Sequence, residues 1–147
     1  MLPDLLTDDR IAFAGSLDWE EAVRRAAAPL VADGSVEERY VDQIVDNVRE
    51  PGGTYMDLGF GVTLAHARPE AGVRRTAVAL LLLATPALLA DSPEHPVRAV
   101  IVLAAEDSSS HQDVMADIAS MLIDEQRRDA LVTATDHAQV RAVIDAD

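Results

Sequence analysis

The sequence predicts an α/β fold, a three-layer sandwich in which a mixed central β-sheet of about five strands has helices on both faces. Helical patterns occupy the first and last parts of the 147-residue chain, and strand patterns gather between them. Two uninterrupted apolar runs, Ala77 to Leu83 and Ala99 to Ala105, suit strands that are covered on both faces. We therefore expect helices above and below one sheet, in a single domain spanning residues 1–147.

The amino-terminal part is predicted to contain a short strand followed by a helix. Residues 11–14 form the strand pattern. Ser16 and Asp18 are candidate caps for a helix over about residues 18–32, and Gly34 is its expected stop.

A second helix is expected over about residues 36–48. Ser35 and Glu38 form a capping-box pattern at its start, and the P-G-G sequence at residues 51–53 ends it. Apolar and aromatic residues recur at helical spacing along it: Tyr40, Val41, Ile44, Val45 and Val48.

The middle of the chain is predicted to form strands, and the end is predicted to form helices. Strands are expected over residues 54–58, 62–65, 76–83 and 97–105. Periodicity alone also allows a buried helix for the leucine-rich run, but its length and flanks favour a strand. Helices are expected over about residues 111–123, 125–134 and 136–145, with Ser109 or Ser110 capping the first.

Composition excludes several classes of function. With 26 acidic and 12 basic residues the formal net charge is −14, so the chain lacks the basic surface that binds nucleic acid. All the basic residues are arginines, which excludes lysine Schiff-base chemistry and a P-loop lysine. The absence of cysteine excludes disulfides, thiolate metal ligands and cysteine nucleophiles.

The sequence also predicts a cytoplasmic protein without direct membrane insertion. Its longest apolar stretch, residues 76–90, is shorter than the about 20 residues that span a bilayer, and Pro86 interrupts it. Residues 1–9 are acidic, unlike the basic start of a signal peptide.

The most informative segment is GFGVTLAHARPE at residues 59–70. A short apolar run, Val62 to Ala65, delivers His66 to the start of a loop punctuated by proline and glycine. A neutral imidazole is a good nucleophile near neutral pH, and it can accept a phosphoryl group on one nitrogen if the other is held by a hydrogen bond. The alternative is a loop histidine that only hydrogen-bonds the backbone.

His111 is the second candidate. It follows another apolar run and a polar loop, at the expected start of a helix. Beside His66 it could donate a hydrogen bond to an anion, assisted by amide groups of the helix start. Helix capping and core packing are the alternatives.

The other basic side chains also have a functional and a structural interpretation. Arg68, Arg74 and Arg75 flank the His66 loop and could offset the charge of a bound phosphoryl group, although the latter two also suit a solvated strand edge. His95 lies in a loop between strands, where we expect only solvent, and His137 is expected at the surface.

Two other kinds of site find little support in the sequence. His66, His111, Asp107 and Asp113 could supply metal ligands, but no HxxxH or HxH spacing is present. A serine hydrolase is excluded because the chain has no G-x-S-x-G motif.

These segments resemble the EIIA type-2 domains (fructose/mannitol-type superfamily) of the bacterial phosphotransferase system, or PTS. Residues 61–73, GVTLAHARPEAGV, are similar to the family's active-site segment in its ascorbate-type branch, and AAED followed by HQDV at residues 104–114 is similar to the segment carrying a second histidine. Further similar segments are WEEAV at 19–23, PLV at 29–31, YV at 40–41 and GTY at 53–55. The similarity spans about residues 18–144, and the two histidine segments together are specific.

The resemblance implies a role for each site residue. His66 would be phosphorylated and His111 would orient the phosphohistidine. Arg68, Arg49 and Thr63 are possible supporting residues, Arg49 by analogy with mannitol-type members. The sequence departs from the family at Ala65, where a proline is usual, and this change is expected to loosen the loop.

The resemblance also implies a function and partners. The chain would be the phosphocarrier EIIA component of a sugar phosphotransferase system, accepting a phosphoryl group from the carrier HPr and passing it to an EIIB component, without metal or cofactor. The sugar would be ascorbate or a related sugar acid or polyol. An alternative is a stand-alone regulatory protein that signals its phosphorylation state to a protein partner. A homodimer is left open.

Overall fold

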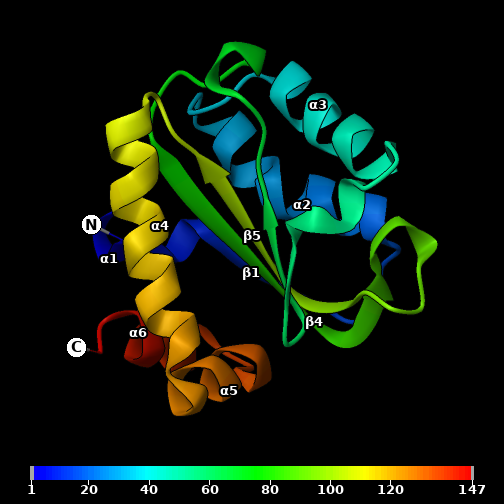
Figure 1. The fold of residues 1–147 in the computed structure, drawn as a ribbon. Coiled ribbons are helices and arrows are strands. Elements are labelled where there is room, and N and C mark those ends of the chain that lie inside the picture. Colours follow the sequence, from blue (N-terminus) through cyan, green and yellow to red (C-terminus); the bar gives the residue numbers. More distant parts are fainter. Residues whose placement is uncertain (1, 147) are drawn as a thin grey trace.

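The computed structural model describes residues 2–146 and has the predicted three-layer α/β architecture (Figure 1). Its sheet has five strands in the order β1-β4-β5-β3-β2. The strands are β1 (Ile11–Ala14), β2 (Asp57–Gly59), β3 (Val62–Ala65), β4 (Ala77–Leu88) and β5 (Pro96–Ala104). The helices are α1 (Leu2–Leu5), α2 (Trp19–Ala32), α3 (Glu38–Arg49), α4 (Ser108–Ile123), α5 (Glu125–Thr133) and α6 (His137–Ile144). Short 3-10 turns are η1 (Asp8–Arg10), η2 (Gly53–Met56), η3 (Pro69–Ala71) and η4 (Leu89–Asp91).

The strand pairing makes the sheet mixed, as predicted. β1 pairs with β4 and β3 pairs with β5 in parallel, whereas β4 with β5 and β2 with β3 are antiparallel. Because β3 and β5 are parallel, their carboxyl ends lie at the same edge of the sheet. That edge carries His66 directly and His111 through the loop that leads into α4.

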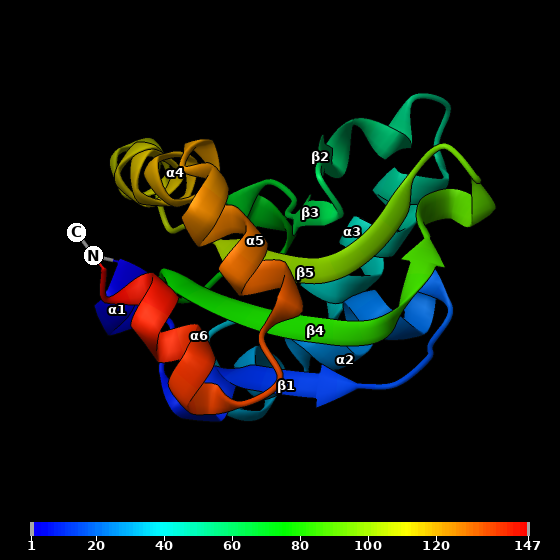
Figure 2. The same cartoon turned by 90° about the horizontal axis from the view of Figure 1, so that it is seen from below.

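Helices cover both faces of the sheet (Figures 1 and 2), and an apolar layer lies between the sheet and the helices on each side. One lies under α2 and α3, and the other lies under α1, α4, α5 and α6. Alternate residues of β4 enter the two layers: Val78, Leu80 and Leu82 enter one, and Ala79, Leu81 and Leu83 enter the other. This burial on both faces explains the uninterrupted apolar run and confirms the strand that the sequence predicts there.

Aspartates begin four of the helices. The Asp18 side chain accepts a hydrogen bond from the Glu21 amide at 2.8 Å, which confirms the cap predicted for α2. The carboxylates of Asp107, Asp124 and Asp136 accept amide hydrogen bonds at the starts of α4, α5 and α6 in the same way. Part of the acidic excess of the chain therefore serves to cap helices.

The predicted capping box at Ser35 is wrong. Ser35 is buried and its amide donates to Asp33 Oδ1 at 2.9 Å, while α3 begins only at Glu38. The next residue, Val36, forms an isolated antiparallel bridge with Val73. This bridge keeps the chain extended where the sequence pattern predicts the first turn of a helix.

Two other predicted boundaries differ from the structure. Residues 53–56 form the 3-10 turn η2, so that only Asp57–Gly59 of the strand predicted over 54–58 is extended. α4 begins at Ser108 rather than at 111, because Asp107 caps it instead of Ser109 or Ser110. The capping contact joins Asp107 Oδ1 to the Ser110 amide at 2.8 Å.

The structure also extends one strand and adds one helix. β4 continues to Leu88, beyond its predicted end at 83, and its pairing with β5 shifts register between Leu82 and Ala87. This irregularity accommodates Pro86, which has no amide hydrogen for a ladder bond. The short helix α1 carries no strong sequence pattern, yet Leu2 is buried in the core beneath α4 and α6.

Candidate functional site

A tight hairpin delivers β3 to the site. Phe60 and Gly61 join β2 to β3, and their φ angles are 58° and 81°. Positive φ at both central residues is the requirement of a type I′ hairpin turn, which favours glycine. Phe60 is exposed, and the guanidinium of Arg128 lies 3.7 Å from the centre of its ring. The hairpin therefore aims the short strand β3 at the edge of the sheet where His66 follows.

His66 is half-buried, and a backbone hydrogen bond orients its ring. Nδ1 lies 2.8 Å from the carbonyl oxygen of Leu64, the residue two positions before it. A carbonyl oxygen only accepts, so Nδ1 must carry a proton in this contact. In the neutral ring the other nitrogen, Nε2, is then unprotonated and has a free lone pair. This is the nucleophilic state that the sequence analysis requires of His66.

A tyrosine hydroxyl fixes the chain directly after His66. Tyr40 of α3 is fully buried, and its hydroxyl accepts a hydrogen bond from the Ala67 amide at 3.0 Å and donates one to the Leu103 carbonyl at 2.7 Å. Burial raises the pKa of Tyr40 to about 12, although the hydrogen bond with Ala67 opposes this rise. The hydroxyl therefore keeps its proton at neutral pH.

Two rings flank His66. The His111 ring, on the first turn of α4, lies 6.3 Å away between ring centres, and the ring of Tyr55 meets His66 edge-on at 6.0 Å. Tyr55 is 59% exposed, so this side of the site faces solvent. The structure thus brings together the two histidines that the sequence analysis selected.

The two histidines line one pocket of about 390 Å³. Three acidic residues also line it: Glu70, Glu106 and Asp107. Hydrogen bonds from the Ser110 amide and hydroxyl hold the pKa of the Asp107 carboxyl below its ordinary value, and Glu106 accepts from the Thr76 amide at 3.2 Å. Both carboxylates therefore have backbone partners at the rim of the pocket.

Arg68 lies beside this pocket rather than in its lining. It is exposed just before η3 and lines an adjoining hollow of about 370 Å³ between η3 and α3, together with Gln43 and Asn47. Glu70 lines both hollows, so the two adjoin at the His66 loop. Within residues 2–146, the Arg68 guanidinium has no ion-pair partner.

Arg49 and Thr63 lie elsewhere. Arg49 ends α3, where its guanidinium forms an ion pair with Glu20 and lies 5.5 Å from the centre of the Trp19 ring. Thr63 is fully buried in β3, and its Oγ1 has no hydrogen-bond partner among the described residues. Arg74 and Arg75 form ion pairs with Glu37 and Asp33.

The other two histidines have partners of their own. The expectation that His95 meets only solvent is wrong, because its Nδ1 lies 2.7 Å from Asp57 Oδ2 and so links the β4–β5 connection to β2. His137 is exposed as expected, but its Nε2 donates to the Ile11 carbonyl at 2.9 Å and its ring packs against Phe13.

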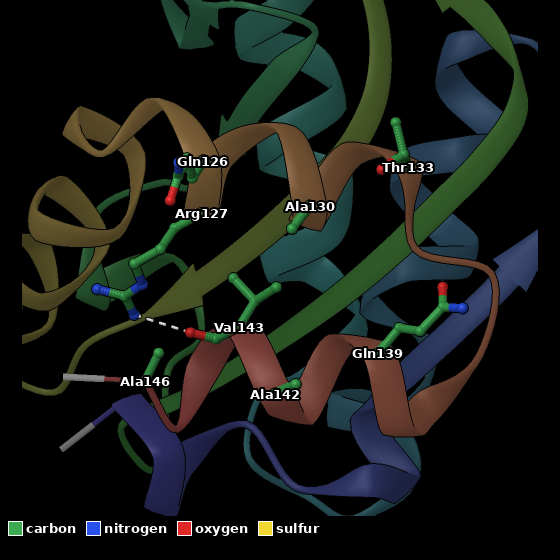
Figure 3. A pocket seen from close by; sticks show the side chains of 8 residues that line it. All are labelled: Gln126, Arg127, Ala130, Thr133, Gln139, Ala142, Val143 and Ala146. Atoms are coloured by element: carbon green, nitrogen blue, oxygen red, sulfur yellow. Dashed lines mark hydrogen bonds between the residues drawn. The ribbon is translucent and has the colours of Figure 1, made fainter.

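A hollow larger than the histidine pocket lies between α5 and α6 (Figure 3), and neither candidate histidine lines it. It has a volume of about 610 Å³, and neither a histidine nor a carboxylate lines it. Its guanidinium, from Arg127, donates to the Val143 carbonyl at 2.9 Å. The volume of a hollow therefore does not coincide with the position of the two candidate histidines.

Two further findings concern a metal site and a membrane-spanning helix. Among residues 2–146, no three histidine or acidic side chains converge as a metal ion would require. No helix in the same part of the chain is both long and apolar enough to cross a membrane.

Sequence reasoning missed Tyr40 and Tyr55 as site residues. Tyr40 stands among apolar residues at helical spacing, so its pattern predicts a core position, which it occupies. The hydroxyl is the one polar side-chain atom on that apolar face, and this was the available signal that Tyr40 forms a buried hydrogen bond. Tyr55 precedes β2 in a turn, and only the tertiary fold places it beside His66.

The chain is similar in sequence to proteins of known families. Residues 4–147 match the family "Phosphoenolpyruvate-dependent sugar phosphotransferase system, EIIA 2". The ascorbate-specific PTS system EIIA component of Escherichia coli (strain K12) is 35% identical over 128 residues, which cover 86% of this chain and 82% of that protein.

Solved structures of the same kind share the fold. The mannitol-specific cryptic phosphotransferase enzyme IIA of Escherichia coli superposes with a TM-score of 0.89 at 28% identity, covering 97% of both chains. Enzyme IIAMTL of Escherichia coli, in its complex with phosphorylated enzyme IIBMTL, gives a TM-score of 0.81 at 25% identity over 96% of this chain and 99% of that chain. The chain therefore belongs to the EIIA 2 family of the phosphoenolpyruvate-dependent sugar phosphotransferase system.

Proposed function

We propose that this EIIA chain carries a phosphoryl group on Nε2 of His66. The observation that carries the proposal is the hydrogen bond between His66 Nδ1 and the Leu64 carbonyl. It leaves Nε2 as the free nitrogen of a ring that shares a pocket with His111. A neutral, oriented imidazole is what nucleophilic attack on phosphorus requires.

In the proposed step, the Nε2 lone pair of His66 bonds to phosphorus while the bond from phosphorus to the donor's histidine nitrogen breaks. The donor nitrogen keeps the electron pair of that bond. The transition state is loose, so the protein acts mainly by positioning groups and stabilising charge. The Nδ1 proton stays on His66, and its hydrogen bond to Leu64 disperses the positive charge that the ring gains.

His111 is proposed to orient the phosphohistidine. Its ring centre lies 6.3 Å from that of His66, and both rings line the same pocket. A ring nitrogen of His111 would donate a hydrogen bond to a phosphoryl oxygen. Ser108 lines the same pocket at the amino-terminal end of α4, where the helix dipole favours an anion.

Three other residues are proposed as support, with unequal access to the site. Arg68 is free to approach the phosphoryl group or the docking partner from the adjoining hollow. Arg49 would have to leave Glu20 to do so. Thr63 lies in the strand that ends at His66 and would act only through β3.

HPr is the proposed phosphoryl donor and an EIIB component the proposed acceptor. The complex between a structural relative and phosphorylated enzyme IIBMTL supports the acceptor. The ascorbate-specific relatives at about 35% identity support ascorbate, or a related sugar acid or polyol, as the transported sugar. The reaction needs neither metal nor cofactor and would take place in the cytoplasm.

The test is phosphorylation of the purified chain by phosphoenolpyruvate, enzyme I and HPr, followed by intact mass. We expect one acid-labile phosphoryl adduct on the wild type and on the His137→Gln control, and none on His66→Ala. An adduct that persists in His66→Ala would show that another residue carries the phosphoryl group. Absence of an adduct on the wild type, beside an active control EIIA, would contradict the proposed function.

A further inference from the structure

The ladder between β3 and β5 is interrupted just beyond His66. The two strands are parallel, with Ala65 opposite Val102, and the Ala99 amide donates to the Gly61 carbonyl at 2.9 Å. Bonds in a parallel ladder advance by two residues on each strand. By this register, the bond after the last paired residues would join the Ala67 amide to the Leu103 carbonyl.

The Tyr40 hydroxyl occupies that position. It accepts from the Ala67 amide at 3.0 Å and donates to the Leu103 carbonyl at 2.7 Å, so both groups are satisfied without meeting each other. A direct bond would hold the amide nitrogen about 2.9 Å from the carbonyl oxygen, and an inserted oxygen holds them farther apart. A side chain from α3 therefore replaces a ladder bond between two strands.

This insertion lies beside the His66 pocket. Ala67 and Leu103, the two residues that the hydroxyl joins, both line the pocket with His66 and His111. The His66 ring is thus held from both sides along the chain, by the Leu64 carbonyl before it and by the Tyr40 hydroxyl just after it. Tyr40 has no exposed surface, so its hydroxyl cannot follow the loop by moving into solvent.

We propose that Tyr40 is a positioning residue for phosphoryl transfer: its hydroxyl keeps β3 and β5 apart beyond Ala65 and thereby aims His66 Nε2 into the pocket. The inference rests on the proposed function of His66. Tyr40 itself touches no reacting atom. Its effect passes through the Ala67 amide and the course of the chain that leaves β3.

A tyrosine that merely fills the core would behave differently. Its loss would lower stability and leave the orientation of the His66 ring and the rate of the bound step unchanged. The Ile44→Val variant supplies this comparison, because Ile44 lies on the same helix, is equally buried, and has no polar side-chain atom. It weakens the packing of α3 and leaves the hydrogen bonds of Tyr40 in place.

The experiment compares the wild type, Tyr40→Phe and Ile44→Val by phosphoryl-transfer kinetics with phospho-HPr and by ¹⁵N spectra of the histidine rings. In Tyr40→Phe we expect kcat to fall about tenfold or more with little change in KM, because misplacement of the nucleophile affects the bound step. The His66 nitrogens should shift from the Nδ1-protonated state toward a mixture of tautomers. Ile44→Val should match the wild type in both.

Wild-type kcat and unchanged His66 nitrogen shifts in Tyr40→Phe would overturn the proposal. Should that variant fail to fold, hydrogen exchange in the wild type decides, because a slowly exchanging Ala67 amide is expected and rapid exchange would show that the hydroxyl does not hold it. If the wild type accepts no phosphoryl group, the proposed function fails, while the ring spectra still show whether Tyr40 orients His66.

Discussion

His66 and His95 both have Nδ1 in a short hydrogen bond, yet the two rings are suited to different work. His66 meets the uncharged carbonyl of Leu64 at 2.8 Å, whereas His95 meets the carboxylate of Asp57 at 2.7 Å. A carbonyl fixes the proton on Nδ1 without supplying charge, so Nε2 keeps its lone pair. A carboxylate also accepts a hydrogen bond, and here this contact ties the β4–β5 connection to β2.

The residues around the two histidines also differ. His66 shares a pocket with His111 at the carboxyl ends of two parallel strands. The side chain of Asp57 is only 9% exposed, and its other oxygen accepts the Gly59 amide at 2.8 Å. The partner of Nδ1, more than the presence of a histidine in a loop, separates a candidate nucleophile from a structural contact.

The largest expected effect separates the two histidines directly. His66→Ala should abolish phosphorylation by phospho-HPr, whereas His95→Ala should keep its rate within about twofold, because His95 only stabilises the fold. Initial rates measured below the unfolding temperature of both variants test this. A similar loss of activity in the two variants would remove the distinction between them.

His111→Gln should come next. Loss of one preorganised donor to a phosphoryl oxygen is expected to slow the transfer about 10- to 100-fold, with His66 still the phosphorylated residue. Single-turnover transfer from phospho-HPr measures it, and intact mass confirms the adduct. A wild-type rate would show that His111 takes no part in the transfer and serves only as a structural residue at the beginning of α4.

Tyr40, beside the pocket, should also make the free energy of unfolding depend on pH in the alkaline range. Because the pKa of Tyr40 is raised to about 12 in the folded protein, the unfolded chain loses this proton first as pH rises. Its contribution is complete below the unfolded pKa of about 10 and declines above it, by about 2–3 kcal/mol when pH reaches the folded value. Urea unfolding at several pH values should therefore show a steeper alkaline loss for the wild type than for Tyr40→Phe. Parallel curves would contradict this.

The smallest expected effect concerns stability at the other histidine. His95→Ala leaves one oxygen of the Asp57 carboxylate, whose side chain is 9% exposed, without its partner. It should lower the free energy of unfolding by about 1–2 kcal/mol at neutral pH. The exposed His137→Ala serves as a control for removal of a histidine hydrogen bond at the surface. Equal losses of unfolding free energy in the two variants would mean that the contact with Asp57 stabilises the fold no more than a histidine hydrogen bond at the surface.

Much of the fold follows from local patterns in the sequence. The doubly buried strands, the helical spacing of α3 and the Asp18 cap are set by neighbouring residues, so the sequence predicts them. The start of α3 is different: the bridge between Val36 and Val73 joins positions far apart in the chain and overrides the capping-box pattern at Ser35. Local signals cannot report such a bond.

The same limit applies to the site. The segment around His66 is conspicuous because glycine, proline and a strand end gather there, and His111 follows a second strand. The decisive features are contacts with backbone groups: the Leu64 carbonyl selects the tautomer, and the Leu103 carbonyl and the Ala67 amide receive Tyr40. Backbone groups have no sequence signature, so residue types alone indicate a candidate histidine but not which of its nitrogens is free.

The most direct measurement is therefore ¹⁵N and ³¹P NMR of the chain after phosphorylation by phospho-HPr. The hydrogen bond between Nδ1 and the Leu64 carbonyl requires the phosphoryl group to reside on Nε2 of His66, with the proton still on Nδ1. A phosphoryl group on Nδ1 of His66, or on any other residue, would contradict the orientation of the ring and the mechanism built on it.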